Sequence, residues 1–226
     1  MRIGVIGAAG KTGRFVMKEG ARRGHEMTAF ARDPAKLAGV EGVSHIFKGD
    51  AVHEADLATF SKGQDAVIVM LNPAKPFKPT TIQADAARYL TRAAERGGAK
   101  RIVWTSSTGL SATRPQPLAA IVKTLLRHLY ADLKEAEGIL EASNLDWTLA
   151  RSVGLTNKPG TGRIRLSFGA LQTPGGPYFF SRADLARALV ELVTDSRAHR
   201  ALVSINSSRR QKWALATKAA RGTSSP

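Results

Sequence analysis

The sequence lacks cysteine altogether, and it also lacks any long apolar run. Without cysteine, disulfide bonds, thiol nucleophiles, zinc fingers and iron–sulfur ligation are excluded. No apolar segment approaches the roughly 18 residues that a membrane-spanning helix requires. The first predicted strand begins at residue 2 and is short, so no N-terminal targeting signal is visible. We therefore expect a soluble cytoplasmic protein whose 226 residues can bury a core within one domain.

Aromatic residues are scarce, and acidic residues are missing from the C-terminal part of the chain. Aromatics make up 6% of the sequence and do not interleave with basic clusters, as a stacking platform for nucleic acid requires. The formal net charge is +16, yet no acidic residue follows Asp195. We interpret this charge as a basic surface with a basic tail and do not expect a nucleic-acid partner, although such binding stays open as a third class of function. The basic residues beyond Asp195 are Arg197, Arg200, Arg209, Arg210, Lys212, Lys218 and Arg221.

Three regularly spaced glycines follow the first apolar run of the chain. The segment from Ile3 to Gly13 reads Ile-Gly-Val-Ile-Gly-Ala-Ala-Gly-Lys-Thr-Gly, which contains G-x-x-G-x-x-G. This pattern is typical of a strand that turns sharply into a helix whose N-terminus faces a dinucleotide pyrophosphate. A tight turn without a ligand is the alternative. We assign cofactor contacts to Gly7, Ala9, Gly10, Lys11, Thr12 and Gly13.

Apolar runs alternate with amphipathic stretches along most of the chain. This alternation predicts an α/β fold with a doubly wound parallel sheet of the Rossmann type. Strands are predicted at 2–6, 27–31, 44–48, 65–71, 100–106, 146–151 and 201–205. Helices are predicted at 12–23, 54–61, 80–97, 118–142 and 182–194.

Two segments break this alternation. Residues 152–180 contain several prolines and glycines, and we predict that they form a small loop region covering the substrate side of the sheet. A plain surface loop is the alternative. Residues 206–226 are rich in Ser, Ala and basic residues, which predicts a poorly ordered tail. The predicted organisation is therefore one dinucleotide-binding domain over residues 1–205, followed by this basic tail.

The end of the second predicted strand distinguishes NAD from NADP. Arg32 follows the strand directly, where NAD-specific folds place an acidic residue against the ribose 2′-hydroxyl. A guanidinium at this position, with Lys11 nearby, favours the 2′-phosphate of NADPH over NADH. A solvated loop arginine is the alternative. Further cofactor contacts are predicted where the third, fourth and fifth strands end, at Asp50, Ala51, Leu71, Asn72 and Ser106.

These motifs occur in an order that resembles the atypical short-chain dehydrogenase/reductases. Within them, the chain is similar to the NmrA-like group and to the bacterial flavin reductase and biliverdin reductase B-like proteins. The resemblance covers residues 1–205 and implies NAD(P) binding, while members range from reductases and epimerase-like enzymes to catalytically silent redox sensors. The chain departs from the family at Arg151-Ser152, where Arg-Pro is common. The motifs are Gly7–Gly13, Ala31–Leu37, Gly49-Asp50, Val103–Ser107 and Ser143–Thr148.

The predicted helix over 118–142 carries Tyr130 and Lys134 in a Y-x-x-x-K pattern. This spacing places both side chains on one helix face, a turn apart. Hydride transfer to a carbonyl or conjugated carbon requires a proton donor, and a nearby ammonium makes a tyrosine hydroxyl a better acid. We predict Tyr130 as this acid, Lys134 as its partner and a contact of the nicotinamide ribose, and Ser107 as the residue that orients the substrate oxygen. A tyrosine at the edge of the core is the alternative.

The predicted function is NADPH-dependent hydride transfer to a small planar acceptor, such as a flavin or a conjugated carbonyl compound. A redox sensor that binds the dinucleotide without turnover is one alternative, and an epimerase- or dehydratase-like enzyme is another. The five histidines are scattered and form no ligand pair, so we predict no metal site. A homodimer built on the helix over 118–142 stays open, because a role in the core explains its apolar residues equally well.

Overall fold

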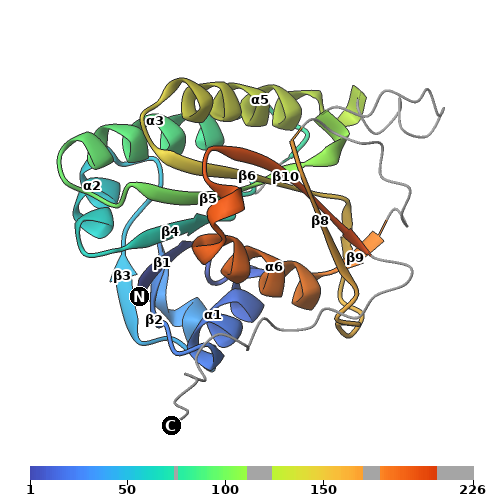
Figure 1. Ribbon diagram of the computed structural model, residues 1–226. Coiled ribbons are helices and arrows are strands. Elements are labelled where there is room, and N and C mark those ends of the chain that lie inside the picture. The colour runs from blue at the N-terminus through green and yellow to red at the C-terminus, as the bar shows by residue number, and fades with distance from the viewer. Residues whose placement is uncertain (74–75, 111–123, 170–178, 208–226) are drawn as a thin grey trace, which may run out of the picture.

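The computed structural model describes residues 1–73, 76–110, 124–169 and 179–207. Within these ranges, eight strands form one sheet in the order β3-β2-β1-β4-β5-β6-β10-β8 (Figure 1). Neighbouring strands pair in parallel except β8, which is antiparallel to β10. This sheet confirms the predicted Rossmann-type α/β fold. The strands are β1 (Arg2–Ile6), β2 (Glu26–Ala31), β3 (His45–Lys48), β4 (Ala66–Val69), β5 (Arg101–Ser107), β6 (Asp146–Ser152), β8 (Ile164–Phe168) and β10 (Ala201–Ser207).

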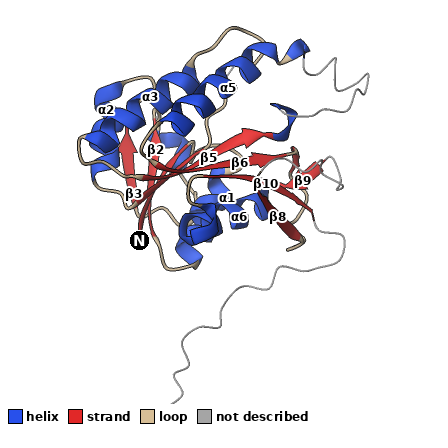
Figure 2. Cartoon of the chain, turned by 45° about the horizontal axis from the view of Figure 1, so that its top comes forward, coloured by secondary structure: helices blue, strands red, loops and turns tan. Residues whose placement is uncertain are grey.

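Helices cover both faces of the sheet (Figure 2). One face carries α1 (Gly13–Arg22) and α6 (Arg182–Thr194), and the other carries α2 (Glu54–Lys62), α3 (Ile82–Glu95) and α5 (Arg127–Ala142). Because successive side chains of a strand point to opposite faces, Ile68 packs with the α1 and α6 side, whereas Val67 and Val69 pack with the other. These residues belong to β4, and this strand is continuously apolar because it contributes to the hydrophobic cores on both faces of the sheet. Short 3₁₀ helices lie in the connections: η1 (Pro34–Leu37), η2 (Thr108–Leu110) and η3 (Ser196–Ala198).

The segment predicted as a cover over the substrate side contains three short strands among its described residues. Part of it, β8, joins the main sheet through antiparallel pairing with β10. Two further short strands, β7 (Gly154–Thr156) and β9 (Phe179–Ser181), pair with each other in parallel. Pro159, Gly160 and Gly162 lie between the short strands β7 and β8.

Some predictions extend beyond the described residues. Residues 118–123 of the predicted helix, 170–178 of the predicted cover and 208–226 of the predicted tail lie outside them. The strand β10 continues to Ser207 with Asn206 buried, so the first residues of the predicted tail belong to the sheet. No helix among the described residues is long and apolar enough to cross a membrane.

Candidate functional site

A large cavity opens at the carboxyl ends of the parallel strands. Strand order reverses between β1 and β4, and the carboxyl edge at such a point is where α/β sheets bind ligands. The cavity has a volume of about 1260 Å³. Nearly all the residues predicted to bind the cofactor or to act in catalysis line it: Gly7, Ala9, Gly10, Lys11, Thr12, Gly13, Arg32, Asp50, Ala51, Leu71, Asn72, Ser106, Ser107 and Tyr130.

The glycine loop forms one wall of this cavity, and it has no room for a side chain at Gly7 or Gly13. Gly7 has φ +92°, and a Cβ there would lie 2.3 Å from the Met70 carbonyl oxygen. A Cβ on Gly13 would lie 2.2 Å from the Gly7 carbonyl oxygen. The turn is closed by the Gly10 amide, which donates to the Gly7 carbonyl over 3.0 Å. The loop thus brings bare backbone and the start of α1 to the cavity, which is the arrangement that binds a pyrophosphate.

Cations gather where the cavity reaches β2 and β3; we call this the β2 end. Arg32 is exposed there, and its guanidinium lies 3.9 Å from Asp50, a separation at which an exposed pair contributes little. Lys11 and Lys36 also line this end. Arg14 fixes Lys36 in place by donating to its carbonyl oxygen over 2.7 Å. The guanidinium of Arg32 is therefore accessible to an anion beside two lysines.

At the opposite end, two hydroxyl groups lie close to one glycine. A Cβ built on Gly109 would lie 2.5 Å from the Tyr130 hydroxyl and 3.2 Å from the Ser107 Oγ. The Ser107 Oγ accepts a hydrogen bond from the Gly109 amide over 3.1 Å. Tyr130 comes from α5 and Ser107 from the end of β5, so the fold brings together residues that are distant in the sequence. Their hydroxyl groups can serve a proton transfer at this place.

Lys134 does not join Tyr130 at the cavity. Its side chain is exposed, and Lys134 is not among the residues that line the space. An α-helix turns by about 100° per residue, so Lys134 lies about 40° beyond Tyr130, on the side away from Leu129 and Leu133. These two leucines face the cavity with Tyr130. The structure therefore places Lys134 outside the cavity, and its pairing with Tyr130 stays a prediction.

Two cavity-lining side chains hold buried polar atoms that have no partner. The Ser106 Oγ and the Gln83 Oε1 are both buried, and neither has a hydrogen-bond partner among the described residues. The Gln83 Nε2 donates to the Leu71 carbonyl, which fixes the orientation of the amide. Buried polar atoms normally pair, so both atoms fit a site that a ligand completes. Gln83 was missed in the sequence, because a glutamine at the start of a helix carries no local signal.

A buried carboxylate on α5 fixes the start of α3, which carries Gln83. Asp132 accepts from the Gln83 amide over 3.1 Å and from the Ala84 amide over 2.9 Å. Burial raises the pKa of Asp132, against the opposing effect of these two hydrogen bonds. The side chain thus replaces a local N-cap, since Thr81 before the helix makes no side-chain cap. Asp132 links the Tyr130 helix to the wall that carries Gln83.

The far wall of the cavity comes from β6, β7 and α6; we call it the β6 end. Ser152, Val153, Gly154, Leu155, Arg182 and Leu185 line it, beside Leu126, Leu129 and Leu133. Near this wall, the guanidinium of Arg151 donates to the buried Glu137 carboxylate. Among the described residues, no group of His, Asp or Glu is arranged to hold a metal ion.

Comparisons with known proteins agree with this architecture. The NAD(P)H-binding family matches residues 7–196. The uncharacterized sugar epimerase YhfK of Bacillus subtilis (strain 168) is 29% identical over 208 residues, which cover 88% of this chain and 92% of that protein.

Two solved structures share the fold. One is a short-chain dehydrogenase/reductase (wide type) from Veillonella parvula DSM 2008 in complex with NADP, with a TM-score of 0.72 and 20% identity over 91% of this chain and 94% of that chain. The other is ChuY, an anaerobillin reductase from Escherichia coli O157:H7, with a TM-score of 0.73 and 22% identity over 93% of this chain and 99% of that chain. Together with the cavity and its glycine loop, these findings confirm the resemblance to the atypical short-chain dehydrogenase/reductases, and the chain belongs to the NAD(P)H-binding family.

Proposed function

We propose that the protein is an NADPH-dependent reductase that transfers hydride to a small planar acceptor, such as a flavin or a conjugated carbonyl compound. The observation that carries the proposal is that one cavity joins the glycine loop and Arg32 to the hydroxyl groups of Tyr130 and Ser107. The Veillonella neighbour binds NADP and ChuY is a reductase, and both share the fold. The glycine loop and Arg32, which would bind the dinucleotide, therefore line the same cavity as the two hydroxyl groups that would transfer a proton.

The chain's own residues would divide the work along the cavity. NADPH would supply the hydride. The glycine loop would hold the pyrophosphate through backbone amides and the start of α1, and Arg32 would pair with the 2′-phosphate. Ser107 would orient the acceptor oxygen or nitrogen. The Tyr130 hydroxyl would deliver a proton to that atom as hydride reaches the conjugated carbon, and solvent would restore the hydroxyl.

The first test is a binding titration of NADPH and NADH with the wild type and Arg32→Ala. We expect the wild type to bind NADPH more tightly, and the variant to lose about tenfold or more of that affinity, because a hydrogen-bonded charge pair is removed. NADH affinity should not change. The control is Arg2→Ala, which removes an exposed arginine paired with Asp65 where β1 begins, at the opposite edge of the sheet. Equal binding of both cofactors by the wild type would contradict the assignment of NADPH.

The second test is steady NADPH oxidation with a panel of flavins and conjugated carbonyl compounds. We expect turnover by the wild type and a lower kcat for Tyr130→Phe, which keeps the ring and removes the hydroxyl. Full turnover by this variant would place the acid elsewhere. A redox sensor is the second candidate, and it is favoured by the position of Lys134 outside the cavity. Tight NADPH binding without oxidation of any acceptor would support the sensor over the reductase.

A further inference from the structure

Three arginines lie near the β6 end of the cavity, and one of them differs from the others. Arg151 pairs with Glu137, and Arg187 pairs with Asp184 over 3.2 Å. The guanidinium of Arg182 instead donates to the neutral Asn157 Oδ1 over 2.8 Å. It makes no ion pair with any carboxylate of the described residues, and Arg182 lines the cavity. Its charge is therefore not neutralised within the described part of the protein.

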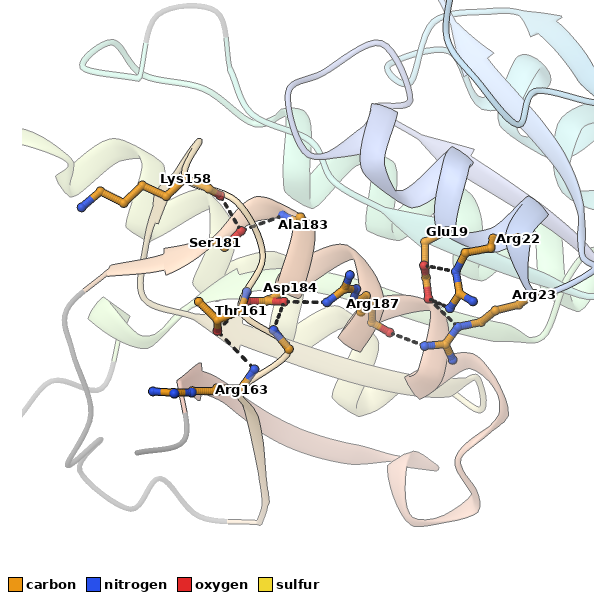
Figure 3. Close-up of polar contacts among 11 residues, drawn as sticks. Glu19, Arg22, Arg23, Lys158, Thr161, Arg163, Ser181, Ala183, Asp184 and Arg187 are labelled. Carbon is orange, nitrogen blue, oxygen red and sulfur yellow. Dashed lines mark hydrogen bonds and ion pairs between the residues drawn. The ribbon is translucent and has the colours of Figure 1, made fainter. Parts of the chain in front are cut away.

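The loop that carries Asn157 is firmly attached to the start of α6 (Figure 3). The Ser181 Oγ donates to the Lys158 carbonyl over 2.9 Å and also accepts from the Ala183 amide. The Asp184 carboxylate, 1% exposed, accepts from the Thr161 amide over 2.7 Å and from the Gly162 amide over 3.0 Å. These bonds hold both Arg182 and its neutral partner in place. The guanidinium is thus positioned before any ligand arrives, which lowers the entropy cost of binding.

The cavity wall near Arg182 is mostly apolar, and Arg182 itself is half-exposed. Val153, Leu155 and Leu185 line the same wall, and leucines of α5 line the neighbouring one. The other charged residues that line the cavity lie at the β2 end: Lys11, Arg32, Asp33, Lys36 and Asp50. A cation between apolar walls binds most favourably to a ligand that brings its own anion.

We propose that Arg182 binds an anionic group, a carboxylate or a phosphate, on the hydride acceptor. The acceptor would then be a planar apolar ring system with an acidic group at its edge. The ring would lie among the leucines of α5 and α6, next to Tyr130, and the acidic group would reach Arg182. This inference rests on the proposed reductase function and adds to it the chemical class of the substrate.

The experiment measures how two fluorescent dyes bind to the NADP⁺-saturated protein. One dye is 8-anilinonaphthalene-1-sulfonate, which is apolar and anionic, and the other is N-phenyl-1-naphthylamine, which has the same rings without the sulfonate. We expect Arg182→Gln to weaken binding of the sulfonate dye by about tenfold or more, and binding of the neutral dye to stay unchanged. Arg182→Lys, which keeps the charge, should retain most of the affinity for the sulfonate dye.

The matched control is Arg163→Gln. Arg163 lies in the same loop as Asn157, is exposed and does not line the cavity. This variant should leave both dyes unaffected. Competition by phenyl phosphate and by benzoate then distinguishes the two sources of charge, because the stronger competitor identifies a phosphate-bearing or a carboxylate-bearing acceptor.

Four results would overturn the inference: no binding of the sulfonate dye when NADP⁺ is present, equal loss of both dyes in Arg182→Gln, an equal effect of Arg163→Gln, or no competition by either anion. The proposed cofactor can fail separately. If the wild type does not distinguish NADPH from NADH, while Arg182→Gln still selectively weakens the sulfonate dye on the free protein, the anion site stands and the NADPH assignment falls.

Discussion

At the scale of single residues, the absence of a side chain shapes the cavity as much as any functional group. Gly13 lies where a Cβ would overlap the carbonyl oxygens of Gly7 and Ala8, at 2.2 and 2.6 Å. Gly138, in the middle of α5, has nothing within 4 Å of the corresponding position. The two glycines therefore contribute in opposite ways, one through close approach of the backbone and the other only through added flexibility.

We expect Gly13→Ala to destabilise the fold by about 1–3 kcal/mol, because backbone must move to admit the methyl group. It should also weaken NADPH binding. The control, Gly138→Ala, should stabilise the fold by about 0.4–1 kcal/mol, because alanine loses less chain entropy on folding into a helix. Urea unfolding and an NADPH titration measure both effects. Similar stability changes in the two variants would contradict the role assigned to the glycine loop.

At the scale of elements, α3 and α5 are joined by the Asp132 carboxylate. We expect Asp132→Ala to destabilise the protein by about 1–2 kcal/mol, the usual cost of losing an N-cap, because two amides at the start of α3 lose their acceptor. One of these amides belongs to Gln83, whose side chain lines the cavity, so NADPH affinity should fall as well. Asp132→Asn, which keeps one acceptor oxygen, should lose less. Urea unfolding of the three proteins tests the order, and equal stability would contradict it.

Element types were predictable because their signals are local. The alternation of apolar runs predicted the parallel strands and the helices between them, and the residues predicted at the ends of those strands line the cavity. The position of Lys134 outside the cavity could not be predicted, because spacing gives the relative angle of two side chains on a helix but not the rotation of the helix against the sheet. The role of Gln83 depends on contacts between distant segments, as does the pairing of β8 with β10, and no short pattern reports such contacts.

At the scale of the whole molecule, a partly buried cluster of Glu19, Arg22 and Arg23 on α1 contacts α6 on one face of the sheet (Figure 3). Glu19 accepts from Arg22 and Arg23, and Arg23 reaches Glu191 on α6. Burial alone would raise the pKa of Glu19, but the hydrogen bonds and charges of the two arginines outweigh it and lower the pKa. A lowered pKa in the folded state means that Glu19 contributes stability above about pH 4.5, and that this contribution is lost as the pH falls through the folded-state pKa.

We expect Glu19→Gln to be less stable than the wild type at neutral pH by about 2 kcal/mol, as for hydrogen bonds to charged groups. The difference should shrink toward zero as the pH falls well below 4.5. The raised pKa of Asp132 acts in the opposite sense, because it lowers stability as the pH rises above about 3.8. Both the wild type and Glu19→Gln contain Asp132, so its effect cancels in the difference between their stabilities. Urea unfolding of both proteins over an acid pH series measures the difference in their free energies of unfolding. A difference that does not depend on pH would contradict the role of the Glu19 charge.

The antiparallel pairing of β8 with β10 also has a consequence for the order of folding. The strand partner of β8 in the main sheet is β10, which lies later in the chain, beyond β9 and α6. A growing chain that has emerged through β6 can already assemble the glycine loop and the β2 end, from contacts among its first six strands. The β6 end must wait for Arg182 and Leu185 of α6, and the sheet is complete only when β10 lies between β6 and β8. The part of the protein that would choose the substrate is therefore completed last, on a half that can already hold the cofactor.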